Sequence, residues 1–350
     1  MVIPTTLLKV PDMQNRLEAL LARKGVLLAD GATGTNLFAM GLESGEAPEL
    51  WNASAPEKVR ALHKGFVDAG ADIILTNSFG GTRHRLKLHN AQDRVFELNL
   101  KAALIARAVA DESGREVIVA GSVGPTGELL IPLGAMSYEE AVDAFIRQIQ
   151  GLKAGGADVA WIETMSSPEE IRAAAEAAIR VGLPYIFTAS FDTAGRTMMG
   201  LAPKDIHTVA DGLAQPPLGV GANCGVGASD ILSSLLDMSE GHEDATLIVK
   251  ANCGIPEFRG TEIHYSGTPE LMADYVRLAV DSGARIIGGC CGTACEHLGA
   301  MRTALDSHPK GARPSVEEVV SRIGPMRNKT AAESGSGVAG PRRERRRARA

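Results

Sequence analysis

The stretch IIGGCCGTAC, residues 286–295, places two cysteines side by side at the end of an apolar run. Cys290 and Cys291 could form a vicinal disulfide, lie as a buried thiol pair, or bind a soft metal ion such as Zn²⁺. The chain has only three further cysteines, which are Cys224, Cys253 and Cys295. The choice among these kinds of chemistry depends on whether the fold brings the distant thiols to the adjacent pair.

The elements that must position these residues follow a repeated unit, in which a helix ends at a glycine turn and an apolar strand begins. The unit is visible in FVDAGADIILTNSF (66–79), LKAGGADVAWIETM (152–165) and AVDSGARIIGGCC (279–291). Glycine just past a helix is the usual left-handed cap, and a continuous apolar run is typical of a strand buried on both faces.

With this unit as a template, eight strands and the helices between them are predicted. The strands are expected at 26–30, 72–78, 116–123, 158–163, 184–190, 218–223, 246–252 and 284–289. The helices are expected at 54–70, 94–113, 137–156, 167–181, 204–214, 229–240, 268–282 and 295–307. Eight alternations of strand and helix predict an α/β protein with one closed (β/α)₈ barrel, a TIM barrel, and an open doubly wound sheet is the alternative.

Polar and thiol side chains gather where these strands end, which is the face of a barrel that carries chemistry. The residues at strand ends are Asp30, Asn77, Glu163, Cys224, Cys253, Cys290 and Cys291. Thiolates that converge from neighbouring strands suit Zn²⁺, and three protein ligands leave one tetrahedral position open. Adjacent strand residues point to opposite faces, so both Cys290 and Cys291 can reach one ion only if the strand breaks there. Gly288, Gly289 and Gly292 permit such a break.

Other interpretations of the cysteines are weaker. A reducing compartment disfavours a vicinal disulfide. Cys291 and Cys295 have a CxxxC spacing, but no further cysteine completes an iron–sulfur motif. Buried cysteines without a metal would have to reach four strand ends by chance. An aldolase-type barrel would use Lys250, the one lysine near a strand end, and would leave the cysteines unexplained.

Six stretches resemble the homocysteine S-methyltransferase family, which includes betaine–homocysteine methyltransferase and the homocysteine-binding module of cobalamin-dependent methionine synthase. They are VLLADGATGT (26–35), DIILTNSF (72–79), GSVGPTG (121–127), WIETM (161–165), GVGANCG (219–225) and IIGGCCGT (286–293). The resemblance covers roughly residues 15–310 in consistent order. It implies a zinc-dependent transfer of a methyl group to homocysteine, which forms methionine.

The resemblance also implies roles for individual residues. Cys224, Cys290 and Cys291 would bind Zn²⁺, and the thiolate of homocysteine would be the fourth ligand. Glu163 would bind the substrate ammonium, and the Asp30–Gly31 turn would contribute to the same pocket. Asn77 is a further candidate for that pocket. Asp30 has an alternative role as the cap of the next helix, because Asp is a favoured cap residue. Glu163 could instead have a purely structural role.

Cys253, in VKANCGIPEF, stands where the methionine synthase module has a small residue. It is expected to be a buried small hydrophobe, or else a spare soft ligand near the metal.

The methyl donor is left open between betaine, a sulfonium and a methylcorrinoid on a separate protein. Quaternary ammonium groups are usually bound by an aromatic cage, and aromatic residues make up 4% of the chain. SFDTAGRTMMG (190–200) and NCGIPEFRG (252–260) resemble the methionine synthase module more closely, which favours the methylcorrinoid protein slightly. A non-catalytic zinc barrel that binds or senses thiols is the alternative function.

Charge and composition set the remaining expectations. The formal charge is −6, but PRRERRRARA at the end holds six arginines and one glutamate, so the rest carries −11. An acidic body argues against nucleic acid as a partner. No run approaches the ~18 apolar residues of a membrane span, and no signal peptide is evident, so the chain is expected in the cytoplasm. The barrel is predicted at 1–328 and a disordered basic tail at 329–350.

Overall fold

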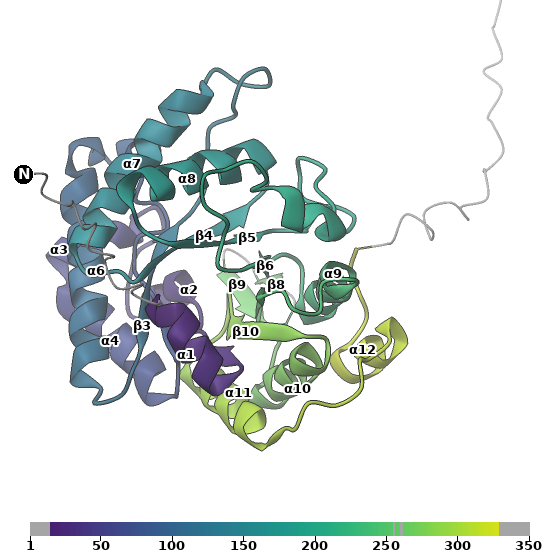
Figure 1. Cartoon of the computed structure of the whole chain (residues 1–350). Helices are drawn as coiled ribbons and strands as arrows, with labels where there is room; N and C mark the ends of the chain where they lie inside the picture. The colour runs from purple at the N-terminus through teal and green to yellow at the C-terminus, as the bar shows by residue number, and fades with distance from the viewer. Residues whose placement is uncertain (1–14, 255, 260–261, 329–350) are drawn as a thin grey trace, which may run out of the picture.

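The computed structural model describes residues 15–328, apart from 255, 260 and 261, and without the side chains of 256–264. Eight parallel strands form one sheet in the order β1-β10-β7-β6-β5-β4-β3-β2. The strands are β1 Leu27–Leu28, β2 Ile73–Leu75, β3 Ile118–Val123, β4 Val159–Met165, β5 Tyr185–Ala189, β6 Val220–Cys224, β7 Leu247–Ala251 and β10 Ala284–Gly289. A parallel bridge between Ala29 and Ile73 joins β1 to β2 and closes the barrel. Figure 1 shows the helices arranged around the strands. The predicted (β/α)₈ fold is confirmed.

Seven of the eight predicted helices surround the strands. They are α4 Pro56–Asp68, α6 Val95–Glu112, α7 Tyr138–Ala154, α8 Pro168–Val181, α9 Ala228–Ser239, α10 Pro269–Asp281 and α11 Cys295–Ser307. The helix predicted at 204–214 is wrong, because this segment forms only the 3₁₀ helix η3, Pro203–Thr208. Gly212 with φ 80° ends any helical continuation, and two prolines follow it at 216 and 217.

Shorter elements lie in the loops between the main strands and helices. They are α2 Thr33–Ala39, η1 Pro48–Leu50, α3 Trp51–Ser54, α5 Arg83–Lys87 and η2 Gln92–Arg94. After β7 the chain forms an antiparallel hairpin, β8 Pro256–Arg259 and β9 Glu262–Tyr265, which the alternating pattern did not predict. The hairpin lies at the end of the barrel where the strands finish, which is also where the cysteines are.

Two helices outside the alternation cover parts of the barrel. The leucines of α1, Arg16–Lys24, pack with the inward side chains of the strands, so α1 closes the end at which the strands begin (Figure 1). Helix α12, Val316–Ile323, packs against α9 and α10. Beyond it, the backbone N–H groups of Arg327 and Asn328 donate to the Asp230 carboxylate. The predicted tail, 329–350, lies outside the described residues.

The interior of the barrel changes from apolar to polar along each strand. Ala120, Trp161 and Ile248 belong to the inner apolar cluster. Two residues further along, on the same inward face, stand Ser122, Glu163 and Lys250. This polar layer lies between the apolar floor and the ends of the strands, where the thiols are.

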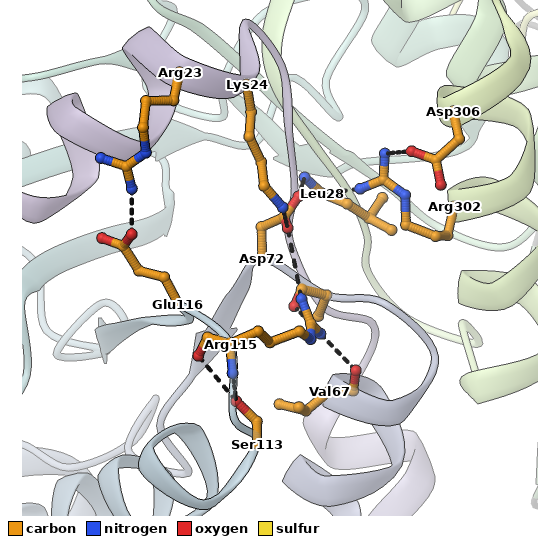
Figure 2. Close-up of polar contacts among 11 residues, drawn as sticks. Arg23, Lys24, Leu28, Val67, Asp72, Ser113, Arg115, Glu116, Arg302 and Asp306 are labelled. Atoms are coloured by element: carbon orange, nitrogen blue, oxygen red, sulfur yellow. Dashed lines mark hydrogen bonds and ion pairs between the residues drawn. The ribbon is translucent and has the colours of Figure 1, made fainter.

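The opposite end of the barrel is held by charge around Asp72 (Figure 2). Its carboxylate, 1% exposed, accepts Lys24 Nζ at 2.6 Å, Arg302 Nη1 at 3.1 Å and the backbone N–H of Leu28 at 3.0 Å. Arg115 Nη1 is 3.7 Å away and the same guanidinium donates to the Val67 and Ala71 carbonyls. One carboxylate thus joins α1, α11 and the first strands.

A buried histidine makes the stability of the fold depend on pH. His63 on α4 is fully buried, and neither ring nitrogen has a hydrogen-bond partner among the described residues. Burial lowers the pKa of His63 to about 4, against about 6.5 in the unfolded chain. Because the folded pKa is depressed, the unfolded state takes up the proton first as pH falls from 6.5 to 4, and stability is lost over this range.

We expect His63→Leu to remove that dependence. Between pH 7.5 and 5.0 the native protein should lose about 2 kcal/mol of unfolding free energy more than the variant, measured by urea unfolding at both pH values. An equal pH dependence in the two proteins would contradict the assignment.

None of the helices in the described ranges has the length and apolarity needed to cross a membrane.

Candidate metal and amino-acid site

Three of the predicted residues meet in one cluster. The Sγ atoms of Cys224, Cys290 and Cys291 all lie within 4.8 Å of one another. Cys224 is the last residue of β6, and the other two follow β10, two strands away in the sheet. All three residues are partly exposed, and they lie at the end of the barrel where the strands finish.

The backbone is locally irregular at both points, as the adjacent cysteines require. Cys224 has φ 62°, in the left-handed region that non-glycine residues seldom adopt. Strand β10 ends at Gly289, and a turn follows in which the Thr293 N–H donates to the Cys290 carbonyl at 3.1 Å. Gly292 within this turn has φ 79°. The predicted break in the strand is confirmed.

The cluster fits a soft divalent ion. At Zn–S distances of about 2.3 Å, tetrahedral thiolates stand about 3.8 Å apart, which the separation of these sulfurs accommodates. Hydrogen bonds with Cys224 and Cys290 lower the pKa of the Cys291 thiol. The hydrogen bond with Cys290 in turn raises the pKa of Cys224. A divalent cation beside the cluster would favour the ionised form of all three thiols, since a nearby opposite charge lowers a thiol pKa.

The remaining two cysteines stand apart from this cluster. Cys253 is 1% exposed, and its backbone N–H donates to the Cys291 carbonyl at 2.8 Å. It packs as a small hydrophobe next to the turn. Cys295 begins α11, and its thiol faces Gly65 of α4.

The polar layer beneath the thiols contains two carboxylates and one ammonium. Lys250 Nζ pairs with Asp30 Oδ1 at 2.8 Å, and the Leu75 N–H donates to Asp30 Oδ2 at 2.8 Å. The Ser122 hydroxyl donates to Glu163 Oε1. These side chains come from four strand ends of the barrel, and each belongs to a buried residue.

Burial and charge shift the ionisation of this layer. Burial raises the pKa of Glu163 to about 7, against the opposing effects of Lys250 and of the Ser122 hydrogen bond. Burial also raises the pKa of Asp30, while Lys250 and the Leu75 N–H oppose the rise. For Lys250 burial acts in the other direction, but the carboxylates of Asp30 and Glu163 outweigh it and raise its pKa. The lysine is therefore a permanent cation inside the barrel.

A chain of hydrogen bonds runs from Trp161 of the inner apolar cluster to the thiols. Trp161 Nε1 donates to Thr188 Oγ1 at 3.1 Å, and Thr188 Oγ1 donates to Asn223 Oδ1 at 2.6 Å. The Asn223 amide also exchanges hydrogen bonds with Thr164 and lies 3.9 Å from Cys290 Sγ. These contacts fix the strand ends that carry Glu163 and Cys224.

The other predicted pocket residues make contacts that hold the loops around the site in place. The Asn77 amide donates to the Pro48 carbonyl at 2.7 Å and to Asn52 Oδ1 at 3.0 Å. A side chain at Gly31 would collide with the Thr293 carbonyl and the Phe66 ring, so glycine there allows the loop after β1 to approach the cysteine turn. Asp30 is not a helix cap, because α2 begins after Ala32 without a side-chain cap. A substrate contact for Asn77, Asp30 or Gly31 remains a prediction.

Two residues at the site were not among those predicted. Lys250 was considered only for an aldolase, and its pairing with Asp30, 220 positions away, has no local signal. Tyr265 on β9 packs over Gly292, and its hydroxyl hydrogen-bonds with Cys291. Burial next to the thiols raises the pKa of Tyr265. An apolar–polar alternation around Tyr265 could have indicated the strand, but not its contact with Cys291.

Comparison with known proteins agrees with this geometry. The chain is 30% identical over 324 residues to the methionine synthase of Mycobacterium tuberculosis and 29% identical over 326 residues to that of Mycobacterium leprae. These matches cover 85% and 87% of this chain but 26% of each relative, so the chain spans about a quarter of their length.

Among solved structures, the chain resembles a homocysteine methyltransferase over nearly the whole length of that protein. The homocysteine methyltransferase MmuM from Escherichia coli, in its metallated form, superimposes with a TM-score of 0.68 at 26% identity. The match covers 83% of this chain and 99% of that protein. A methyltransferase from Methanosarcina mazei, with a TM-score of 0.50 at 14% identity, shares the fold.

The model of the homocysteine S-methyltransferase family matches residues 27–305 of this chain. This range contains the eight strands and the three clustered cysteines. This chain belongs to the homocysteine S-methyltransferase family, a family of methyltransferases.

Proposed function

We propose that this protein is a zinc-dependent homocysteine S-methyltransferase that forms methionine. The observation that carries the proposal is the convergence of three thiols within 4.8 Å at the catalytic face of a barrel of this family. Cys224, Cys290 and Cys291 would hold the ion and leave one coordination position for the substrate thiol. Zinc, when bound, deprotonates a coordinated thiol and so provides a nucleophilic sulfur at neutral pH.

The residues of the chain then orient the substrate. Glu163 lies below the thiols and has one oxygen on the Ser122 hydroxyl. A substrate ammonium next to it would favour the ionised carboxylate, since an opposite charge lowers a raised carboxyl pKa. The low exposure of this layer excludes bulk water and strengthens the pairing.

We expect Glu163→Gln to weaken homocysteine binding by about 2–4 kcal/mol while the protein keeps its zinc. The amide has nearly the same shape but cannot balance an ammonium. Calorimetric titration of zinc-loaded protein measures the affinity, and metal analysis of the same samples is the control. Unchanged affinity would show that Glu163 is structural.

For the methyl donor we propose a methyl group on a positively polarised atom, either betaine or a methylcorrinoid carried by a separate protein. Resemblance of 190–200 and 252–260 to the methionine synthase module supports the second, and Tyr265 beside Cys291 supplies an aromatic face that a quaternary ammonium could use.

Turnover assays distinguish these donors. Zinc-loaded protein and homocysteine are incubated with betaine, with a methylcorrinoid protein, or with neither, and methionine is measured. Methionine from betaine alone identifies the small donor, and methionine only with the corrinoid protein identifies the other. Homocysteine binding without methionine from any donor would favour a non-catalytic thiol-binding barrel and contradict the proposal.

A further inference from the structure

The three clustered cysteines are potential nucleophiles as well as metal ligands. A metal-bound thiol is deprotonated, and the thiolate is the form of sulfur that attacks an electrophile. In the proposed function, Cys224, Cys290 and Cys291 would share one ion with the substrate thiol, and their own sulfurs already lie within 4.8 Å of one another. A methyl donor would therefore meet several thiolates, of which only one is the substrate.

Cys291 is covered by Tyr265 of the β8–β9 hairpin. The Tyr265 ring packs directly against the turn, because a side chain at Gly292 would collide with its Cβ, Cγ and Cδ2 atoms. The hydroxyl of the same residue hydrogen-bonds with the Cys291 thiol. Gly292, which also has φ 79°, thus lets the ring approach closely enough for its hydroxyl to reach the sulfur.

Cys290 has a different donor, the amide of Asn223 on β6. Asn223 Nδ2 lies 3.9 Å from Cys290 Sγ and donates to Thr164 Oγ1 at 2.7 Å. Asn223 Oδ1 accepts the Thr188 hydroxyl at 2.6 Å, which fixes the orientation of the amide. Among the described residues, Cys224 has side-chain hydrogen bonds only with the other two thiols. Two of the three ligands therefore each have a donor from outside the cluster.

A hydrogen bond to a thiolate reduces its reactivity. The donor stabilises the negative charge on sulfur, so the sulfur becomes less basic. The nucleophilicity of thiolates falls with their basicity, and a loss of about two pKa units slows attack roughly tenfold. A hydroxyl that donates to one ligand but not to the substrate sulfur would thus favour reaction at the substrate. Contacts of this kind, from residues behind the ligands, are a general way to tune a metal site.

We propose that Tyr265 is a positioning residue that protects Cys291 from methylation and so directs the methyl group to the substrate sulfur. The inference rests on the proposed function and adds to it the choice among sulfurs. In the reaction that Tyr265 suppresses, the Cys291 sulfur bonds to the methyl carbon, and the bond between that carbon and the donor atom breaks, with its electron pair left on the donor. Cys291 becomes a neutral thioether, and the cluster loses one anionic ligand.

Methylation of the cysteines by methyl iodide tests this assignment. The full chain is loaded with zinc and treated without homocysteine, and mass spectrometry of its peptides measures methylation at each cysteine over time. In Tyr265→Phe, which keeps the ring but removes the hydroxyl, Cys291 should react roughly tenfold faster than in the native protein. Zinc content, measured before treatment, should be the same in both proteins. The rate at Cys295, which lies away from the cluster, should be unchanged and reports the general access of the reagent.

Tyr138→Phe is the matched control, because it removes a tyrosine hydroxyl that donates to Glu176 between α7 and α8. It should leave the rate at Cys291 at its native value. Cobalt(II)-loaded protein gives a second measurement that does not depend on access of the reagent. Loss of the Tyr265 hydroxyl should move the thiolate-to-cobalt absorption to longer wavelength, since electrons on a sulfur without a donor are held less tightly.

The outcomes separate this inference from the proposed function. An unchanged rate at Cys291 in Tyr265→Phe, or an unshifted cobalt absorption, would overturn the inference. An equal acceleration at Cys295 would overturn it too, because the substitution would then have loosened the whole protein, and so would loss of zinc from the variant. Failure of the native zinc-loaded protein to bind homocysteine would instead overturn the proposed function, since neither measurement on Tyr265 contains homocysteine.

Discussion

Cys224→Ala, Cys290→Ala and Cys291→Ala should each abolish zinc binding and methionine formation. In the proposed site three thiolates hold the ion, so loss of any one would leave two sulfurs and an enlarged opening to water. Cys224 also lies in a left-handed conformation that places its thiol toward the other two. Because zinc affinity at thiolate sites depends strongly on the number of ligands, we expect occupancy below about 0.1 ion per chain after dialysis.

Metal analysis of the purified variants measures this directly, and Cys295→Ala is the matched control. It makes the same chemical change at a cysteine that lies against α4, away from the cluster, so it should retain one zinc and native turnover. Treatment of the native protein with a chelator should stop turnover, and added zinc should restore it. Full zinc occupancy in Cys224→Ala would show that the ion is held elsewhere.

The sequence predicted the barrel because its signals are local and repeated. Each strand follows a glycine turn and is a short apolar run, so a template from three segments located all eight strands. The cysteines were predicted for a related reason: parallel strands all end at one face, so residues at strand ends must converge whatever their separation in the chain. The cluster of Cys224, Cys290 and Cys291 is confirmed as a geometric arrangement.

Other features could not be predicted because they depend on contacts between distant residues, which leave no periodic pattern in the sequence. Tyr265 reaches Cys291 from a hairpin inserted between β7 and α10, outside the alternation of strands and helices. Lys250 is a charged residue inside a barrel, and its ion pair with Asp30 and the nearby Glu163 carboxylate make this position tolerable. Segment 204–214 has a helix-like composition, but Gly212 and the prolines that follow prevent a full helix.

Asp72→Ala should strongly reduce the stability of the fold but leave the cysteine cluster intact. The carboxylate lies at the end of the barrel where strands begin, and Lys24, Arg302 and Arg115 surround it. Its removal takes the buried counter-charge from Lys24 and Arg115, whereas Arg302 keeps its pair with Asp306. Arg302 already has one buried Nε without a partner among the described residues.

We expect Asp72→Ala to reduce the free energy of unfolding by about 2–3 kcal/mol, because the buried Leu28 N–H loses its acceptor and partly exposed cations lose a counter-charge. Its backbone hydrogen bonds to Leu28 and Ile118 persist, so the β1–β2–β3 register should survive. Urea unfolding followed by circular dichroism measures the loss. Asp68→Ala is the control, since it removes an exposed partner of Lys64 on α4 and should cost no more than about 0.5 kcal/mol.

The same variant separates the two ends of the barrel. Asp72 precedes β2, whereas Cys224 ends β6 and the other two cysteines follow β10, so Asp72 and the thiols lie at opposite ends of the strands. Under conditions where Asp72→Ala is still folded, it should therefore bind one zinc per chain and homocysteine with native affinity. A loss of zinc that exceeds the unfolded fraction would mean that the Asp72 network also fixes the geometry of the cysteine turn, through Arg302 on α11, the helix that follows this turn.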